Sequence, residues 1–482
     1  MSHKLFKIDF RQIAFYTFII LCICCLLYSI TNILAEYFQY PVSTESIYVN
    51  ETNPENFFPD IIICNHRIAS LERLDNLNLP KSKHNNKLGP GKVWEKLING
   101  HENFDFGNFD PNDILWKSVE INHYSVNTMK KVGIQRKDFI LDCGIVDFLN
   151  RKEPFINCME YINDYFSNEY ALCHRLSLPK FLKTTAGSVH SNIAGVRINL
   201  FIPLDDASGL ISYLSGVRIT IEDPNFPIIP QAGGIDVGLG HEVSVGFRRV
   251  VSKKVMRHNF KCIDPEMAIK RNFAGARYSL NNFTCEQMCV SYYMKRICNC
   301  VTLQIFGANS SVCDLSNIEI LNCLQKHYTE IESKSQHCHN KHCLPPCYTA
   351  KYDLQTNIVP FPSFDFLPYY LSSILVREDL SSTIKNSILK SLNRKYASEF
   401  EEYETLQKQF INVHVYRKSH ETEYIKENFI HTYWSLLGHI GGSLGMFLGI
   451  SLLGSLDVIF QIYHTWQKKM DRYRYMFRKI QQ

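Results

Sequence analysis

A glycine-rich apolar segment near the end of the chain carries the residues best suited to chemistry. It reads GHIGGSLGMFLGISLLGSLDVIF from Gly438 to Phe460 and includes an aspartate, Asp457. Each glycine weakens a helix by roughly 1 kcal/mol relative to alanine, and polar backbone at membrane depth is tolerated only beside protein or water. A carboxylate at that depth likewise needs water or a partner. The segment therefore predicts helices that crowd around a water-filled path rather than a helix that faces lipid.

The segment presents two helical faces. The first consists of Gly441, Gly445 and Gly449, whose four-residue spacing permits close helix approach. The second has three- and four-residue spacing and consists of His439, Gly442, Met446 and Gly449. A dimerising membrane anchor is the simpler interpretation of the glycine stripe. That interpretation explains neither the GIS tripeptide at 449–451 nor Asp457.

Two apolar stretches are long enough to hold such a path in a bilayer. Residues 12–35 and 429–456 contain no Asp, Glu, Lys or Arg, and at about 1.5 Å per residue each crosses a hydrocarbon core of roughly 30 Å. The first is too long for a signal peptide and is followed by no small-residue cleavage site. Basic residues, which mark cytoplasmic ends, flank both stretches: Lys4, Lys7 and Arg11 before the first, and Lys468, Lys469, Arg472, Arg474, Arg478 and Lys479 after the second.

These features predict five consecutive regions. They are a cytoplasmic N-terminus at 1–11, a first transmembrane helix at 12–35, an extracellular domain at 36–428, a second transmembrane helix with the pore at 429–463, and a cytoplasmic C-terminus at 464–482. The net charge of +5 is too small for nucleic-acid binding. The chain also lacks a phosphate-binding GxxxxGK[ST] loop and a GxSxG nucleophile elbow, so we do not expect an enzyme.

The cysteines support an extracellular domain. Of 17, three lie in the first apolar stretch (Cys22, Cys24 and Cys25), and the remaining 14 predict disulfides in an oxidising compartment. Ten of them fall between 262 and 347. Three histidines among the last of these, His337, His339 and His342, leave zinc binding as an alternative. Glycosylation sequons in the same domain are Asn50, Asn282 and Asn309.

Hydrophobic periodicity predicts the rest of the fold. Residues 196–202, 217–221 and 411–415 alternate apolar and polar side chains, which is typical of half-buried strands. Residues 378–410 contain no Pro or Gly and have mixed charge, which favours helix. The expected fold class is therefore α+β: two transmembrane helices with a large disulfide-rich extracellular domain, built on a central antiparallel β-sheet with peripheral helices.

Four motifs together resemble the degenerin/epithelial sodium channel superfamily, which includes acid-sensing and neuropeptide-gated channels. They are EYFQYPV at 36–42, FFPDIIICN at 57–65, CEQMCVSYYMKRICNC at 285–300 and GGSLGMFLGISLL at 441–453. The last two are highly specific, and the four motifs are distributed over nearly the whole chain.

The resemblance implies a cysteine pairing that spacing alone leaves open. The implied pairs are Cys64–Cys173, Cys143–Cys158, Cys262–Cys347, Cys285–Cys343, Cys289–Cys338, Cys298–Cys323 and Cys300–Cys313. It also implies a trimer in which Gly449, Ile450 and Ser451 form the selectivity filter and bind Na⁺ transiently. Neither a cofactor nor a structural metal is expected.

The resemblance further implies roles for residues around the filter. Gly438 matches the position where bulky replacements hold relatives open, and it forms the pore and gate with His439, Gly442, Met446 and Asp457. Ser443 stands where the family has glutamine. Glu421, Glu423 and Glu427 either attract cations at the outer mouth or form a solvated face. Tyr40 and Phe260 are expected to couple a disulfide-stapled thumb to the first helix.

The expected function is a trimeric amiloride-sensitive cation channel of the plasma membrane, homomeric or heteromeric, embedded in lipid. We expect Na⁺ as the permeant ion and an extracellular ligand, such as a peptide or protons, as the stimulus. The alternative is a two-span ligand-binding or adhesion receptor without a pore, which would take up or bind a ligand but carry no current.

Overall fold

The chain divides into two compact units. The computed structural model describes residues 10–67, 73, 130–146, 155–167, 170–187, 194–203, 214–224, 230, 233–258, 260–262, 285–286, 293–301, 313, 318–327, 329–330, 333, 343–394, 396, 398–449 and 451–480. The helical unit comprises Met1–Glu45, Arg257–Phe260 and Glu427–Gln482, and the sheet unit comprises Ser46–Met256 and Lys261–Lys426.

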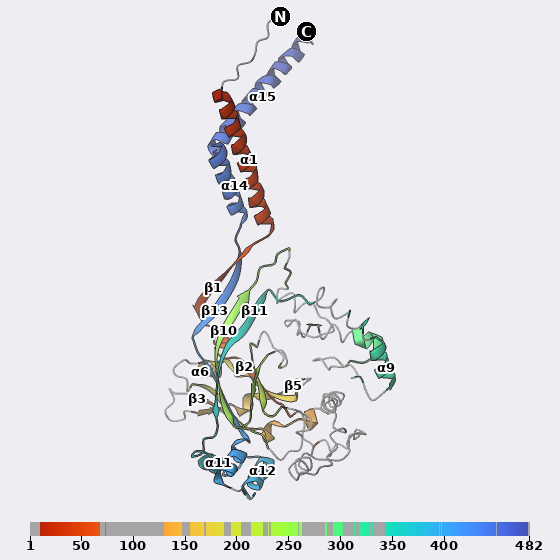
Figure 1. Ribbon diagram of the computed structural model, residues 1–482, viewed down its shortest axis with the longest axis vertical. Helices are drawn as coiled ribbons and strands as arrows, with labels where there is room; N and C mark the ends of the chain where they lie inside the picture. Colours follow the sequence, from red (N-terminus) through yellow and green to blue (C-terminus); the bar gives the residue numbers. More distant parts are fainter. Residues whose placement is uncertain are drawn as a thin grey trace. The chain divides into compact units, whose positions relative to one another are not determined.

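The helical unit is built from three long helices. They are α1 (Phe10–Phe38), α14 (Tyr433–Leu448) and α15 (Leu452–Ile480). Figure 1 shows α1 and α14 side by side. Among the described residues, one helical stretch, Ile13–Phe38, is long and apolar enough to cross a membrane by length and composition.

The segment predicted as the second transmembrane helix, 429–463, contains more than one element. Strand β13 (Glu421–Phe429) reaches Phe429, and α14 begins only at Tyr433 because the side chain of Thr432 caps it, accepting a hydrogen bond from the Ser435 amide at 3.2 Å. The helix stops at Leu448, a second helix starts at Leu452, and this second helix continues well past residue 463. The interruption lies at the GIS tripeptide, which the family resemblance identifies as the filter position.

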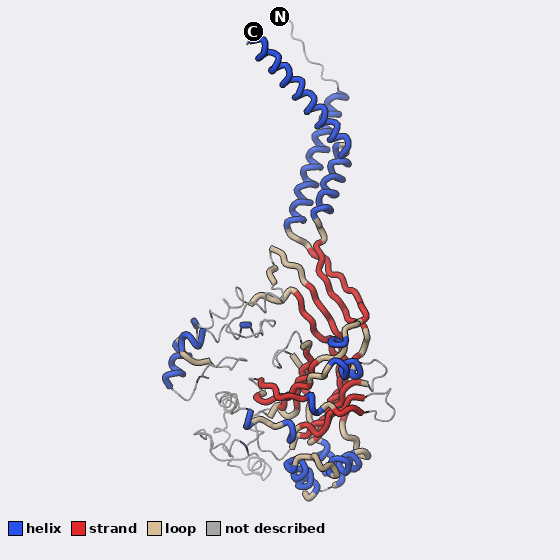
Figure 2. The backbone as a smooth tube through the Cα atoms, turned by 180° about the vertical axis from the view of Figure 1, so that it is seen from behind, coloured by secondary structure: helices blue, strands red, loops and turns tan. Residues whose placement is uncertain are grey.

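The sheet unit contains two sheets among its described residues. The larger has eight strands in the order β1-β13-β10-β12-β7-β3-β4, with β11 also paired to β10. Its strands, red in Figure 2, are β1 (Val42–Asn50), β3 (Ile140–Val146), β4 (Phe155–Asn157), β7 (Gly195–Phe201), β10 (His241–Lys253), β11 (Tyr348–Pro360), β12 (Phe410–Arg417) and β13.

The smaller sheet has five strands in the order β5-β6-β2-β8-β9. They are β2 (Asp60–Asn65), β5 (Ile162–Ser167), β6 (Ala171–Leu176), β8 (Val217–Glu222) and β9 (Ile235–Val237). Residues of both sheets share one apolar core, to which β7 and β12 contribute Ile198 and Val413 and β2 and β8 contribute Ile61 and Ile219.

All three strands predicted from periodicity are present as β7, β8 and β12, but their expected arrangement is partly wrong. β7 and β12 pair antiparallel, whereas β8 belongs to the smaller sheet. The large sheet is mixed rather than antiparallel, because β10 runs parallel to both β12 and β13.

The region predicted to be helical, 378–410, forms two helices. These are α12 (Ser382–Leu392) and α13 (Glu399–Gln407), capped by the side-chain oxygens of Ser381 and Ser398. With α11 (Leu367–Leu375) they pack around Phe201 and Phe410. Shorter helices are η1 (Pro54–Asn56), η3 (Arg136–Asp138), η4 (Met159–Tyr161), α6 (Lys180–Ala186) and α9 (Ile318–Lys326).

Six disulfides lie within the described part of the chain. They are Cys64–Cys173, Cys143–Cys158, Cys262–Cys347, Cys285–Cys343, Cys298–Cys323 and Cys300–Cys313. All six are among the seven pairs that the resemblance implies. The seventh, Cys289–Cys338, lies outside the described residues, as do the three histidines of the zinc alternative.

Candidate ion pathway

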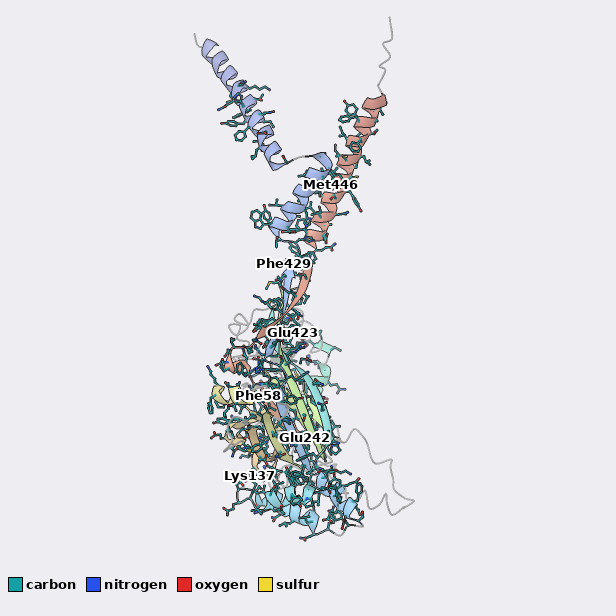
Figure 3. The ribbon with its side chains drawn as sticks, turned by 90° about the vertical axis from the view of Figure 1, so that its left-hand side faces the viewer. Phe58, Lys137, Glu242, Glu423, Phe429 and Met446 are labelled. Atoms are coloured by element: carbon teal, nitrogen blue, oxygen red, sulfur yellow. A yellow bond between two sulfur atoms is a disulfide. The ribbon has the colours of Figure 1, made fainter. Side chains whose placement is uncertain are left out.

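The break between α14 and α15 has a defined geometry. Gly449 adopts a left-handed conformation (φ 64°), and its amide donates to the Gly445 carbonyl at 3.0 Å. Glycine is the residue that adopts this conformation without strain, so the sequence ends the helix here. Ile450 lies outside the described residues. Figure 3 labels Met446 on the last turn of α14, just before the break.

Ser451 has a structural partner in this arrangement. Its hydroxyl oxygen accepts a hydrogen bond from the Gly454 amide at 3.1 Å, so it caps the start of α15. A hydroxyl oxygen has two lone pairs, and the cap uses one of them. The predicted filter serine therefore also fixes where α15 begins, a role that the GIS pattern did not predict.

The termini of the two helices differ in their electrostatics. A helix ending at Leu448 leaves carbonyl oxygens of its last turn outside the regular hydrogen-bond ladder. That end also carries the negative end of the helix dipole, which favours a cation. The first turn of α15 carries the opposite partial charge. The carbonyls at the end of α14 are consequently the best cation ligands that the described backbone offers at the break.

The glycines of α14 leave open space around the helix. A methyl group placed at Gly438, Gly441, Gly442 or Gly449 would meet no atom within 4 Å. Met446, predicted on the same pore face as Gly442, has 79% of its surface exposed. Asp457 is also exposed, on the second turn of α15. Gly438, Gly442, Met446 and Asp457, four of the predicted pore residues, thus lie on exposed surfaces of this chain.

A serine pair joins α1 to α14. The hydroxyl of Ser443 donates to the His439 carbonyl at 2.9 Å, and its oxygen lies 3.2 Å from the hydroxyl oxygen of Ser29. Leu26, one turn before Ser29, is 6% exposed and therefore buried. The serine found where the family has glutamine thus contributes a polar contact between two helices.

His439 has a neighbour that sequence reasoning missed. Its ring lies 5.7 Å from the ring of His431, and Nε2 of His431 lies 3.3 Å from a carboxylate oxygen of Glu36 at the end of α1. Two imidazoles and a carboxylate thus meet at one end of the α1–α14 pair. The eight-residue spacing of the histidines gave no signal for this contact, because His431 precedes the helix.

The exit of α1 turns sharply at Tyr40. This residue has a positive φ of 51°, and its ring lies 6.2 Å from Tyr37 and 6.3 Å from Phe429. Phe260, the other residue predicted to couple the thumb to the first helix, lies under the guanidinium of Arg257 at 5.5 Å. The aromatic partners of Tyr40 that the structure places at its ring thus come from α1 and β13.

Two of the three glutamates predicted near the outer mouth pair with arginines. Glu423, labelled in Figure 3, accepts from Ser46 at 2.7 Å and lies 3.1 Å from Arg248. Glu427 lies 3.5 Å from Arg257. Glu421 is exposed at the start of β13. Paired carboxylates attract a passing cation less strongly, so Glu423 and Glu427 act first as structural anchors of β13.

A buried chain of charges fixes three strands of the sheet unit. The carboxylate of Glu51, just after β1, accepts from Thr422 of β13 at 3.1 Å and lies 3.4 Å from Arg249 of β10. Arg249 also pairs with Asp223 at 2.9 Å. Buried charges are tolerated only when paired in this way, so the partners hold β1, β10 and β13 in one register.

The buried histidines of the sheet unit favour the neutral form. Burial lowers the pKa of His66, His174 and His414, and for His414 it lowers the pKa to about 4. Burial therefore makes all three side chains bind a proton less readily than an exposed histidine. Sequon residue Asn50 is exposed at the end of β1, while Asn282 and Asn309 lie outside the described residues.

Comparisons with a family model and with individual known proteins all find similarity to channel proteins. The family model described as amiloride-sensitive sodium channel matches residues 2–460. The Caenorhabditis elegans "Degenerin-like protein asic-2" is 20% identical, covering 89% of this chain and 77% of the relative. The zebrafish (Danio rerio) "Acid-sensing ion channel 4-B" is 22% identical, covering 96% of this chain and 73% of the relative. The Xenopus laevis "Epithelial sodium channel subunit gamma-2" is 21% identical, covering 55% of this chain and 37% of the relative.

Proposed function

Because the chain belongs to the amiloride-sensitive sodium channel family, a family of ion channels rather than enzymes, we propose that it is a trimeric, amiloride-sensitive cation channel that conducts Na⁺ through its C-terminal segment. The observation that carries this proposal is the break at 449–451 inside an apolar segment. A helix that only anchors a protein in lipid keeps its backbone hydrogen bonds, because unsatisfied backbone groups in hydrocarbon are costly.

The proposed filter combines the backbone at the end of α14 with Ser451. The last-turn carbonyls of α14 point their partial negative charge toward the break, and hard cations prefer such oxygen ligands. The Ser451 hydroxyl keeps one lone pair free beside its bond to the Gly454 amide. Asp457, exposed in α15, raises the local cation concentration and repels anions.

A trimer is supported by what a single chain leaves open. One chain offers too few oxygen atoms to enclose an ion, and the glycine faces of α14 have no neighbour within 4 Å at Gly438, Gly441, Gly442 and Gly449. Copies of α14 related by threefold symmetry would complete the ligand ring and pack against these faces. The subunits are either identical copies or related chains.

The proposed topology has two membrane spans. α14 has 16 residues and is about 24 Å long, which is shorter than a hydrocarbon core of roughly 30 Å. The first turns of α15 would complete the crossing. The basic residues after it, with those before α1, would then lie in the cytoplasm, and 36–428 would be extracellular in a plasma-membrane channel with lipid around α1.

We further propose that an extracellular ligand, a peptide or protons, opens the channel. A ligand opens a channel only by binding the open state more tightly than the closed state. For protons, the group that favours the proposal is His439 with His431 and Glu36, since it sits at the end of both α1 and α14. The buried histidines of the sheet unit are poorer sensors near neutral pH because burial keeps them uncharged.

The test is voltage clamp of oocytes that express the full chain, during peptide application and pH steps. We expect an amiloride-blocked current whose reversal potential shifts when external Na⁺ is replaced by a large organic cation. Replacement Ser451→Ala should change the ratio of Na⁺ to K⁺ permeability. The matched control is Ser443→Ala, which removes a hydroxyl from the same segment but away from the break. Saturable ligand binding without current at a surface-expressed protein would instead support the receptor alternative.

A further inference from the structure

The turn at Arg257–Phe260 belongs to the helical unit, although the chain on both sides of it belongs to the sheet unit. The turn is closed by two backbone hydrogen bonds, from the Arg257 amide to the Phe260 carbonyl at 2.8 Å and in the reverse direction at 3.2 Å. It leaves the helical unit through Lys261, which directly precedes the Cys262–Cys347 disulfide. The turn is therefore joined directly along the chain to the cysteine-rich region at 262–347.

Arg257 holds β13 from this turn. Its guanidinium lies 5.5 Å from the centre of the Phe260 ring, within the range of a cation–π interaction. It also lies 3.5 Å from the carboxylate of Glu427 on β13. The side chains of Arg257 and Glu427 are only 20% and 16% exposed. Solvent therefore screens this pair less than a surface ion pair.

The position of Glu427 makes the contact relevant to the proposed pore. It lies two residues before the end of β13, and the Ile430 amide just beyond the strand donates to the Pro41 carbonyl at the exit of α1. Thr432 then caps α14. Whatever moves Glu427 therefore moves the start of α14 and its contact with α1.

The geometry of the pair leaves room for it to tighten. A bidentate arginine–carboxylate pair has two hydrogen bonds of about 2.7–2.9 Å, whereas here the single ion-pair distance is 3.5 Å. Nε of Arg257 is buried and makes no hydrogen bond. A shift of the turn by under about 1 Å would thus change the interaction energy substantially, because unpaired buried donors are costly.

We propose that Arg257 is a positioning residue for gating: its ion pair with Glu427 transmits the position of the cysteine-rich region to β13 and thereby to α14. The inference rests on the proposed channel function and adds a route to the second pore helix. It is distinct from the expected coupling of Tyr40 with Phe260, which leads to the first helix.

The test is a double-mutant cycle on full-length channels in oocytes. To give a measurable current without a known stimulus, all channels carry Gly438→Phe, because the resemblance implies that a bulky residue at this position holds the channel open. Single-channel open probability and surface biotinylation are measured for Arg257→Gln, Glu427→Gln, their combination, and the charge swap Arg257→Glu with Glu427→Arg. The matched control is Arg248→Gln or Glu423→Gln, an ion pair that also involves β13 but lies in the sheet unit.

We expect each single replacement at Arg257 or Glu427 to change open probability by about five-fold or more in the same direction. The combination should do no more than one replacement alone, and the swap should restore the parental value. The control pair should leave open probability unchanged. Arg257→Lys, which keeps the charge, should stay close to the parent and covers the case in which Arg257→Gln does not reach the surface.

Independent, additive effects of the two replacements, or an unchanged open probability in Arg257→Gln, would overturn the inference while the channel itself still conducts. Absence of current from the surface-expressed parent would instead refute the channel proposal. The two failures are therefore distinguishable.

Discussion

Acidification should destabilise this protein through His414, whose replacement should remove part of that sensitivity. The side chain lies in β12, is 2% exposed, and is 2.9 Å through Nε2 from the Ala194 carbonyl oxygen. Its ring stacks on Tyr416 at 5.2 Å. Burial lowers its pKa from 6.5 to about 4, and the charge of Arg197 acts in the same direction, while the bond to Ala194 opposes the shift.

The direction in which stability changes with pH follows from proton binding. The unfolded chain takes up a proton at His414 as the pH falls through about 6.5, but the folded protein does not do so until about 4. Stability is therefore complete above the unfolded pKa and falls between these two values. At about pH 5, proton binding at His414 favours the unfolded state over the folded state by a factor of roughly 30. The free energy of unfolding is therefore about 2 kcal/mol lower than at about pH 7.5.

The assay compares the parent with His414→Gln, whose amide can still donate to the Ala194 carbonyl. Urea unfolding of the detergent-solubilised full chain is followed by near-ultraviolet circular dichroism at about pH 7.5 and about pH 5. The parent should lose about 2 kcal/mol more than the variant. His66 and His174 contribute equally to both proteins, so they cancel. Equal losses in parent and variant would refute the assignment to His414.

Three further perturbations test other parts of the structure. Gly449 has φ 64° and open space around it. Its replacement by Ala should strain the break by about 1 kcal/mol and alter ion permeability ratios, whereas Asn, which tolerates this conformation, should preserve them. Identical permeability ratios in the two variants would count against the break. Gly195→Ala should destabilise the sheet unit by more than about 2 kcal/mol, because φ is 106° and the added carbon would lie 2.2 Å from the Val415 carbonyl oxygen. Chemical denaturation measures this loss, and the control is Gly144→Ala, where the nearest atom to the added carbon lies at 3.9 Å. Replacing both Cys64 and Cys173 by Ala should lower stability by about 2–5 kcal/mol, since they link β2 to β6; surface biotinylation after a temperature step should detect the loss, and undiminished surface expression would contradict it.

Local patterns allowed much of the fold to be predicted. Alternating side chains identified β7, β8 and β12. In β7 the polar face is only partly buried, as the pattern predicts, whereas β12 and most of β8 bury both faces. The absence of Pro and Gly identified the region of α12 and α13. Each of these features depends on a few neighbouring residues, so it can be recognised from the sequence alone. The family resemblance, rather than a local pattern, marked the GIS tripeptide at the break before α15, where the left-handed backbone favours glycine.

Contacts between distant segments could not be predicted in the same way. Nothing in the alternation of 217–221 indicates that β8 joins the smaller sheet, or that β10 runs parallel to β12, because every half-buried strand shows the same period. The long strands β10 and β11 do alternate, and closer attention to that alternation would have found them.

The sequence by itself determined which residues interrupt the last apolar segment and which cysteines lie outside the first one, because these are properties of composition and spacing. Only the tertiary structure decided that Glu427 pairs with Arg257, that His431 lies beside His439, and that Ser451 caps α15. The physical reason is that such contacts form between groups whose meeting depends on how sheets and helices pack. No local propensity encodes a partner 170 residues away, as Glu427 is from Arg257.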